Sequence, residues 1–272
     1  MIESAPGSTP LTRTSSRVVA ARKLSRRRTR DERRSFMAEG PQAVAEAVRA
    51  GGVTEVFATE AALSRHTGLL AEAESFGARV FAVADSGLAA LTDTVHPQGI
   101  VAVCGYVDTT LPETVRLAVV LDGIADPGNA GTILRTADAA GAQAVVFPHG
   151  SVDPYNGKCV RASVGSLFHL PVVRGGDTDE HLDALRAKGL RILAADVRGE
   201  TDLDAAIDDG LLRQPTAWLF GSEAHGLSDA LTERADVRVR VPIYGAAESL
   251  NLATAAAVCL YASAREHRKG ET

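Results

Sequence analysis

Two glycine-bearing loops in the last third of the chain constrain its fold more than any other feature. The segment FGSEAHGLS (Phe220 to Ser228) follows the apolar run AWL, and the segment IYGAAESLN (Ile243 to Asn251) follows VRVRVP and leads into an alanine-rich helix. Short apolar runs that end in glycine and polar residues are typical of buried strands followed by tight loops. The sequence therefore predicts a pocket at these strand ends, built largely from main-chain groups.

The strand and helix patterns predict an α/β protein with two domains. Residues 35–105 alternate short helices with strands, and residues 106–116 have the polar, proline-containing composition of a linker. From residue 117 onward, strand and helix patterns recur in succession as far as the final helix. Strands that alternate with helices imply a largely parallel sheet covered on both faces. We expect residues 117–272 to form this sheet and residues 1–34 to form a basic, flexible arm.

Composition and cysteine usage narrow the class of protein. The chain of 272 residues is 45% hydrophobic, yet no apolar stretch approaches the roughly 18 residues that would cross a membrane. The N-terminus lacks the apolar core of a secretory signal. The three cysteines (Cys104, Cys159 and Cys259) form no CxxC pair, and the seven histidines form no HxxxH pattern. We therefore expect a reduced, cytoplasmic protein without disulfides and without a metal site.

Positive charge is concentrated near the N-terminus. Between Arg13 and Arg34 the chain carries ten Arg or Lys residues and two acidic ones, although its overall net charge is −5. A basic segment attached to an acidic body is typical of proteins that bind polyanions, and a solubilising tail is the alternative. RNA or DNA binding is favoured because arginine pairs with phosphate in two-pronged geometry. The candidate RNA-binding residues of this segment are Arg22, Lys23, Arg26, Arg27 and Arg28.

Polar residues gather in four clusters that could carry chemistry. Asn129 lies near a helix start in DPGNAG, where capping the helix is the simpler interpretation, and Arg135 follows about two turns later. Lys158, Arg161 and Ser163 lie together in a segment that is otherwise read as a surface helix, and Arg161 is a further candidate for RNA binding. Glu223 lies between Gly221 and Gly226. Ser249 and Asn251 are placed to cap the last helix or to contact a ligand.

Taken together and in order, these segments resemble the SpoU branch of the SPOUT superfamily, which are RNA 2′-O-ribose methyltransferases. The matching motifs are DPGNAGTILRTADAAGA, FGSEAHGLS and VPIYGAAESLNLATAAAVCLY, with RASVGSLFHLPV between the first two. The resemblance covers about residues 117–266. The basic segment and the unit that ends in HPQGIVAV are similar to the substrate-binding extension of many members, which resembles ribosomal protein L30e.

The resemblance implies a C-terminal domain with a deep trefoil knot that binds S-adenosylmethionine. Arg135 matches the arginine thought to activate the ribose hydroxyl, although a free arginine is effectively always protonated, so we favour a role in orienting the hydroxyl and stabilising the alkoxide. The other matching functional positions are Asn129, Glu223, Ser249 and Asn251. Cofactor-binding positions implied by the resemblance are Leu219, Gly221, Val241, Ile243, Ser249, Leu250 and Asn251.

The resemblance also implies partners. Family members are typically dimers that join around the knot, and the alanine-rich final helix would allow close packing. We expect the substrate to be 23S ribosomal RNA, because the L30e-like extension resembles that of rRNA-modifying members, including some that confer resistance to ribosome-targeting antibiotics. Transfer RNA and a non-catalytic RNA-binding role are alternatives. A nucleotide-dependent oxidoreductase is disfavoured because the glycine fingerprint of such enzymes is missing.

Overall fold

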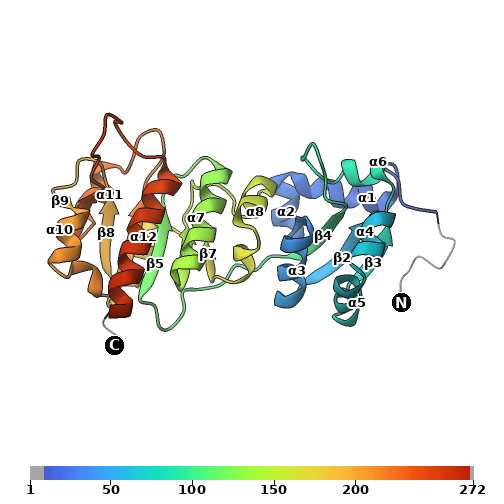
Figure 1. Ribbon diagram of the computed structural model, residues 1–272, viewed down its shortest axis with the longest axis horizontal. Helices are drawn as coiled ribbons and strands as arrows, with labels where there is room; N and C mark the ends of the chain where they lie inside the picture. The colour runs from blue at the N-terminus through green and yellow to red at the C-terminus, as the bar shows by residue number, and fades with distance from the viewer. Residues whose placement is uncertain (1–8, 270–272) are drawn as a thin grey trace. The chain divides into compact units, whose positions relative to one another are not determined.

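The computed structural model describes residues 9–269, and the chain divides into two compact units (Figure 1). The smaller unit extends to Val107 and also contains Tyr155–His169, whereas the larger unit contains Asp108–Pro154 and the chain from Leu170 onward. The sequence places the segment Tyr155–His169 in the second domain. It groups instead with the first because its helix packs on a strand of the small sheet, with an ion pair between Arg161 and Glu39.

The smaller unit is built on a four-stranded mixed sheet in the order β1-β4-β2-β3. Only β2 and β3 run parallel to each other. The strands are β1 (Ser35–Glu39), β2 (Val53–Ala58), β3 (Arg79–Ala82) and β4 (Ile100–Gly105). The helices are α1 (Ser16–Arg22), η1 (Lys23–Ser25), α2 (Arg27–Arg33), α3 (Pro41–Ala50), α4 (Glu60–Arg65), α5 (Thr67–Ser75), α6 (Asp85–Ala89), α8 (Gly157–Ser163) and η2 (Ser166–Phe168).

The basic segment is ordered in this structure, which differs from the flexible arm that its composition predicts. Val18, Ala21 and Leu24 are buried and join the core of the small sheet together with Phe57 and Phe81. Their spacing of three residues places them on one face of helical chain, and this face covers the sheet. Arg22, Lys23 and Arg26 therefore lie on the outer side of a packed element, whereas Arg30 is buried. The first eight residues of the predicted arm lie outside the described range.

The larger unit contains seven parallel strands in the order β7-β6-β5-β10-β8-β11-β9, as the strand and helix alternation predicts. The strands are β5 (Leu117–Leu121), β6 (Ala144–Phe147), β7 (Val172–Arg174), β8 (Arg191–Ala195), β9 (Thr201–Asp202), β10 (Thr216–Phe220) and β11 (Val237–Arg240). The helices are α7 (Pro127–Ala140), α9 (Thr178–Ala187), α10 (Leu203–Asp208), η3 (Leu211–Arg213), α11 (Asp229–Glu233) and α12 (Leu252–Lys269). Within the described residues, no helix combines the length and the apolar character that crossing a lipid bilayer requires.

Both faces of the large sheet are covered, and strand β10 shows how. All five of its residues are buried. Leu219 packs in a cluster with Leu182 and Leu185 of α9. The neighbouring Trp218 points to the opposite face, where its Nε1 donates a hydrogen bond of 2.9 Å to Ser263 of α12. Helices α7 and α12 pack side by side on that second face (Figure 1).

Candidate functional site

Three loops leave the large sheet at the same edge. Strands β5 and β10 are parallel neighbours, and β8 lies between β10 and β11. The loop after β5 leads into α7, the loop after β10 contains residues 221–228, and the loop after β11 contains residues 241–251. In open parallel sheets, the crevice outside the carboxyl ends of the strands is where ligands bind. The candidate ligand-binding residues of the larger unit are therefore expected at this edge.

Helix α7 begins with a cap that the sequence interpretation missed. The carboxylate of Asp126 accepts hydrogen bonds from the backbone N–H groups of Gly128 (2.6 Å) and Asn129 (3.0 Å). Pro127 occupies the first turn, where its missing N–H costs nothing. Because Asp126 caps the helix, the interpretation of Asn129 as the cap is wrong. The Asp-Pro pair at the start of the helix is the signal that identifies the cap.

The Glu223 carboxylate connects the loop after β10 to the start of α7. It accepts hydrogen bonds from the backbone N–H groups of Ala125 (3.1 Å) and Asp126 (3.2 Å). It also accepts one from Nδ2 of Asn129, at 3.0 Å. Glu223 and Asn129 are 94 residues apart in sequence, so this single carboxylate fixes the separation of two loops.

Asn251 completes a cluster of three side chains. Its Nδ2 donates a hydrogen bond of 3.1 Å to Oδ1 of Asn129. Its Oδ1 accepts from the backbone N–H groups of Ala253 (2.9 Å) and Thr254 (3.4 Å), which makes Asn251 the cap of α12. The two interpretations offered for Asn251, capping and presentation to a site, are therefore both compatible with its position. Asn129 thus bridges Glu223 and Asn251, one from each of the other loops.

Hydrogen bonding keeps Glu223 ionised. Burial on its own would raise the pKa of this carboxyl. The hydrogen bonds from the Asn129 side chain and from backbone N–H groups outweigh that effect and lower the pKa below its ordinary value of 4.5. The three-residue cluster therefore carries one negative charge at neutral pH, held by donors that come from the loop after β5.

The loop after β10 is folded back tightly on itself. A Cβ atom at Gly221 would lie 2.4 Å from the carbonyl carbon of Gly226, so only glycine fits at this close approach. Gly226 has φ +69°, a backbone angle that side chains disfavour, and its N–H donates to the Ser222 carbonyl at 2.8 Å. These two glycines set the turn that carries Glu223.

Arg135 and Ser249 do not join the cluster. Arg135 is exposed on α7, about 9 Å along the helix axis from Asn129 at 1.5 Å per residue. Within residues 9–269 its side chain has no hydrogen bond or ion pair, so its guanidinium is available to a ligand. Ser249 is also exposed, in the loop after β11. The structure therefore brings together three of the five predicted catalytic positions and leaves these two apart.

The predicted cofactor-binding positions all lie at this edge of the sheet. Leu219 is fully buried in β10, two residues before Gly221. The other positions follow β11 in a segment without regular secondary structure, in which Ile243 and Leu250 expose about a third of their surface. This segment contains Val241, Ile243, Ser249, Leu250 and Asn251.

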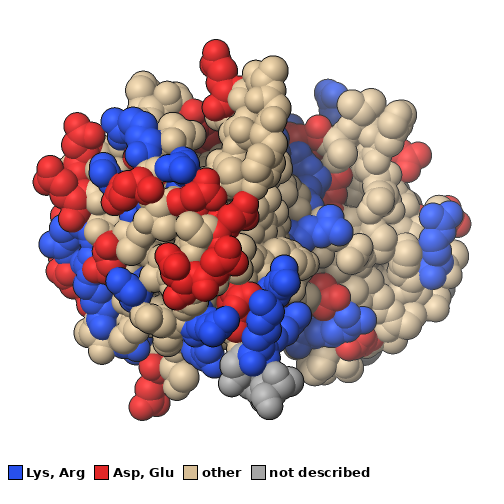
Figure 2. Space-filling model, turned by 60° about the vertical axis from the view of Figure 1, so that its left-hand side comes forward, with Lys and Arg blue, Asp and Glu red and all other residues tan. Residues whose placement is uncertain are grey.

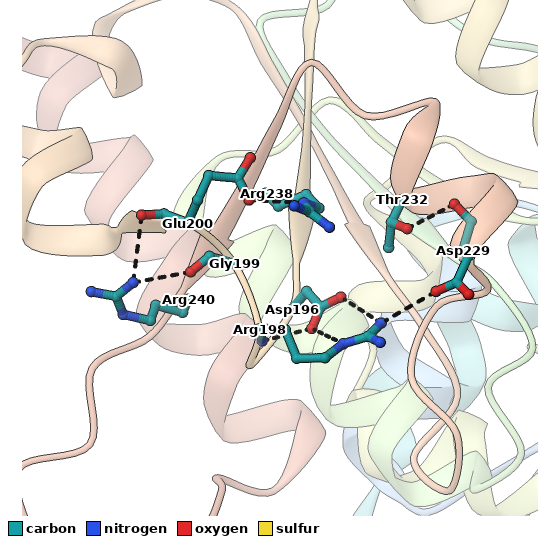
Figure 3. A network of polar contacts seen from close by, with 8 residues as sticks. All are labelled: Asp196, Arg198, Gly199, Glu200, Asp229, Thr232, Arg238 and Arg240. Carbon is teal, nitrogen blue, oxygen red and sulfur yellow. Dashed lines mark hydrogen bonds and ion pairs between the residues drawn. The ribbon is translucent and has the colours of Figure 1, made fainter.

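A second polar network lies at the carboxyl ends of β8 and β11 (Figure 3). Asp196 directly follows β8, accepts from the backbone N–H of Arg198 at 2.8 Å and pairs with its guanidinium at 3.2 Å. Arg198 also reaches Asp229, the first residue of α11, at 3.7 Å. Arg240, which ends β11, donates to the Gly199 carbonyl at 3.0 Å. These contacts connect the loop after β8 to the elements on both sides of it, and the sequence interpretation did not identify them.

The predicted RNA-binding residues differ in how they are paired. Arg22, Lys23 and Arg26 are exposed and have no ion pair within the described residues. Arg27 and Arg28 lie beside Asp31 and Glu32 at 3.8 Å and 2.7 Å. Arg161 is paired with Glu39 at 3.2 Å. On the face that Figure 2 shows, basic and acidic side chains are interspersed.

Comparisons with known proteins agree with this arrangement. A family model described as the SpoU rRNA methylase family matches residues 116–261, and one described as an MRM3-like substrate-binding domain matches residues 15–102. The 23S rRNA (guanosine(2553)-2′-O)-methyltransferase RlmP of Bacillus subtilis is 35% identical over 240 residues, covering 88% of this chain and 92% of that protein. The resemblance to SpoU proteins that the motifs predict is thereby confirmed.

Two solved structures share the fold of the chain. The AdoMet-bound rRNA methyltransferase from Sinorhizobium meliloti has a TM-score of 0.81 at 31% identity, covering 94% of this chain and 97% of that one. The SpoU methyltransferase AviRb from Streptomyces viridochromogenes, in complex with AdoMet, has a TM-score of 0.82 at 30% identity, covering 94% of this chain and 100% of that one. The mixed α/β architecture with a parallel-sheet domain is common to all three proteins.

Proposed function

Since this chain belongs to the SpoU rRNA methylase family, we propose that it transfers a methyl group from S-adenosylmethionine to a ribose 2′-hydroxyl of 23S ribosomal RNA. The observation that carries the proposal is the hydrogen-bonded cluster of Asn129, Glu223 and Asn251. Each residue comes from one of the three motifs that mark the family, and the cluster unites them at the carboxyl edge of a parallel sheet.

The loops at this edge suit the cofactor by the chemistry of their groups. Ile243 and Leu250 offer partly exposed apolar surface of the kind that an adenine ring packs against. Gly221 and its neighbours present main-chain groups, which fit the polar atoms of a ribose and an amino acid. We therefore assign cofactor binding to Leu219, Gly221, Val241, Ile243, Ser249, Leu250 and Asn251.

The chain's own residues need to position the ribose and assist the loss of the proton from its 2′-hydroxyl. When bound, S-adenosylmethionine supplies a methyl group that is already electrophilic. Arg135 is exposed and unpaired within the described residues, so it can contact the 2′-oxygen or a neighbouring phosphate. A guanidinium remains protonated in proteins, so Arg135 orients the hydroxyl and stabilises the negative charge that develops on its oxygen. Asn129 and Glu223 hold the two loops at the separation that this alignment requires.

The smaller unit binds the RNA in this proposal. A family model described as a substrate-binding domain matches this unit, and its helices α1 and α2 carry exposed cations. We assign RNA contacts to Arg22, Lys23, Arg26, Arg27, Arg28 and Arg161. Relatives that are named for 23S rRNA come from both Bacillus subtilis and Streptomyces viridochromogenes, which favours this RNA over transfer RNA. We also propose that the protein acts in the cytoplasm, because its relatives named for 23S rRNA are bacterial proteins.

We also propose that two copies pair through α12, beside the predicted trefoil knot. Val258 and Tyr261 expose 40% and 54% of their surface on this helix, whereas its inner face is rich in alanine and buried. Exposed apolar side chains on one helix favour contact with a second copy. Light scattering after gel filtration should give the mass of a dimer, and Tyr261→Glu should shift it towards the monomer. A wild-type protein that stays monomeric at high concentration would contradict the pairing.

Methyl transfer to defined RNAs tests the function. Recombinant protein is incubated with labelled S-adenosylmethionine and with 23S rRNA, 16S rRNA or total tRNA from cells that lack the gene. We expect label in 23S rRNA alone, at one ribose. The phosphodiester bond on the 3′ side of that ribose should resist alkaline hydrolysis, because its 2′-hydroxyl is methylated. Label in tRNA alone would assign the protein to the tRNA alternative. Cofactor binding without transfer to any RNA would support the non-catalytic alternative.

A further inference from the structure

The smaller unit contains a hollow to which the proposed function assigns no role. It measures about 660 Å³ and lies between the turn before α1, helix α1 and helix α6. Volumes of about 300–1,000 Å³ are usual for sites that take small ligands. Among the described residues its lining contains two arginines, two hydroxyl groups, three small apolar side chains and no acidic residue: Arg13, Thr14, Val19, Arg22, Ser86, Ala89 and Ala90.

The wall that carries Arg13 is held in place by main-chain contacts. Leu11 pairs with the end of β3 and the residues that follow it, donating to the Ala82 carbonyl (2.9 Å) and accepting from the Ala84 N–H (2.8 Å). Helix α6 approaches it closely, because a Cβ atom at Gly87 would lie 2.6 Å from the Leu11 carbonyl oxygen. The next turn is closed by a hydrogen bond of 2.9 Å from the Thr12 N–H to the Ser15 hydroxyl. The turn is therefore ordered, and the start of the Arg13 side chain is fixed.

The two arginines of the hollow are unpaired, unlike Arg17 and Arg30 of the same segment. Within residues 9–269 the side chain of neither Arg13 nor Arg22 has an ion pair or a hydrogen bond. By contrast, Arg17 pairs with Glu55 at 3.2 Å, and Arg30 donates to two backbone carbonyls. Two like charges in the lining of one hollow raise its positive potential, which attracts an anion. Arginine forks match the oxygens of a phosphate in particular.

We propose that this hollow binds a phosphate group of the RNA substrate. Arg13 and Arg22 donate to its oxygens, the Thr14 and Ser86 hydroxyls add further donors, and the attached ribose lies against Val19 and the two alanines of the hollow. The inference rests on the proposed function, since it takes RNA as the ligand. A contact of this kind fixes the register of the RNA on the small unit and does not select its sequence.

The salt dependence of RNA binding tests the proposal. Dissociation constants for 23S rRNA are measured at several salt concentrations for the wild type, for Arg13→Ala/Arg22→Ala and for the control Arg49→Ala/Arg65→Ala. Both double variants remove two positive charges from exposed positions of the small unit, but the control residues lie on α3 and α4, away from the hollow. Losing two phosphate contacts should lower the slope of log K against log salt by about 1.4 to 1.8. The control should leave it nearly unchanged. Equal slopes for the two double variants would overturn the proposal.

A second variant separates the hollow from its charges. Ala89→Trp keeps both arginines and fills the space between α6 and α1, so it should weaken RNA binding while the urea midpoint of unfolding stays the same. RNA binding at wild-type strength by this variant would overturn the proposal. A different result would also overturn it: inorganic phosphate binds the wild type saturably, and Arg13→Ala/Arg22→Ala abolishes this binding but leaves RNA binding unchanged. The ligand of the hollow would then be a free anion. Absence of methyl transfer by the wild type would contradict the proposed function instead. The RNA dissociation constants of the wild type and the variants could still be compared in that case.

Discussion

The two units of the molecule arrange their polar groups in opposite ways. In the larger unit, Asn129, Glu223 and Asn251 are hydrogen bonded to one another and to backbone groups at the ends of two helices. In the smaller unit, Arg13 and Arg22 stand on ordered chain but contact no acidic group within the described residues. Chemistry requires fixed distances, and hydrogen bonds supply them. Binding of a polyanion is favoured by cations that have not already been neutralised.

Solvation explains why each arrangement is stable. A carboxylate that is partly withdrawn from water, as Glu223 is, loses hydration and needs donors to replace it. An exposed guanidinium keeps its hydration and needs no partner until the ligand arrives. The two regions should therefore respond differently to substitution: the first through geometry and the second through charge.

The largest effect is expected at Arg135. Arg135→Ala should lower kcat by about 100- to 1,000-fold, because one donor to the developing oxyanion is lost. Binding of S-adenosylmethionine should be nearly unchanged, since within the described residues the Arg135 side chain has no hydrogen bond or ion pair to the predicted cofactor loops. Single-turnover methyl transfer and cofactor titration calorimetry measure the two quantities separately.

A control arginine keeps this test specific. Arg268→Ala removes an equally exposed cation near the end of α12 and should retain wild-type kcat. Transfer by Arg135→Ala at the rate of this control would show that Arg135 is only a solvated residue of the helix surface.

The next effect sharpens the comparison inside the basic segment itself. Arg30 is 4% exposed and donates to the carbonyls of Leu24 (3.0 Å) and Ser25 (2.9 Å). Because hydrogen bonds of charged groups are worth about 1.5–3 kcal/mol, Arg30→Ala should destabilise the small unit by roughly that amount. Arg22→Ala, on the exposed side, should change stability by less than about 0.5 kcal/mol. Hydrogen exchange of α1 and α2 reports the small unit, since the single tryptophan lies in the large one.

The opposite order of the two stability effects would contradict the assignment of Arg30 as structural and of Arg22 as available for binding. If Arg22→Ala opened α1 and α2 while Arg30→Ala did not, the exposed cations would be structural. The hollow beside Arg22 would then have another explanation.

These two arginines also show what sequence alone can resolve. Composition marks the whole segment as basic, but only the spacing of Val18, Ala21 and Leu24 indicates which side of it faces the core. The parallel sheet could be predicted because strand and helix patterns are local. The pairing of α8 with the small sheet could not, since its ion pair with Glu39 joins residues 122 positions apart.

The candidate site follows the same rule. The residue types at Asn129, Glu223 and Asn251 could be recognised in the sequence, because each lies in a short motif after an apolar strand. Their hydrogen bonds could not be predicted, because they depend on the order of strands in the sheet. Asp126 was missed because the position of the cap depends on where α7 begins, and a shift of three residues moves the cap from Asn129 to Asp126.

A smaller effect is expected when Glu223 loses its charge. Glu223→Gln keeps the size of the side chain, but its amide has a single acceptor oxygen. It can therefore accept from only one of the Ala125 and Asp126 amides, and its NH2 group faces the other N–H. Making one of these hydrogen bonds neutral and losing the other corresponds to about a tenfold loss in kcat/KM. Steady-state methyl transfer measures it, and an unchanged kcat/KM would mean that the loops keep their separation without this charge.

The same variant carries a pH test. The pKa of Glu223 is lowered in the folded protein, so its contribution to stability is present above about pH 4.5 and is lost as the pH falls through the lowered value. The urea midpoints of wild type and Glu223→Gln, followed by Trp218 fluorescence, should therefore differ at neutral pH and converge below that range. A gap that persists in acid would point to packing as its cause.

The smallest effect is expected in the network at the ends of β8 and β11, where two residues of one ion pair differ in exposure (Figure 3). The Arg198 side chain is 63% exposed, whereas that of Asp196 is 7% exposed and also accepts the Arg198 N–H. Arg198→Ala should hardly move the urea midpoint, and added salt should remove what difference there is, because exposed pairs are screened. Asp196→Ala should lower the midpoint more, since it leaves a backbone donor without its acceptor. The reverse order would mean that the contact of Arg198 with Asp229, rather than the turn at Asp196, holds this edge of the sheet together.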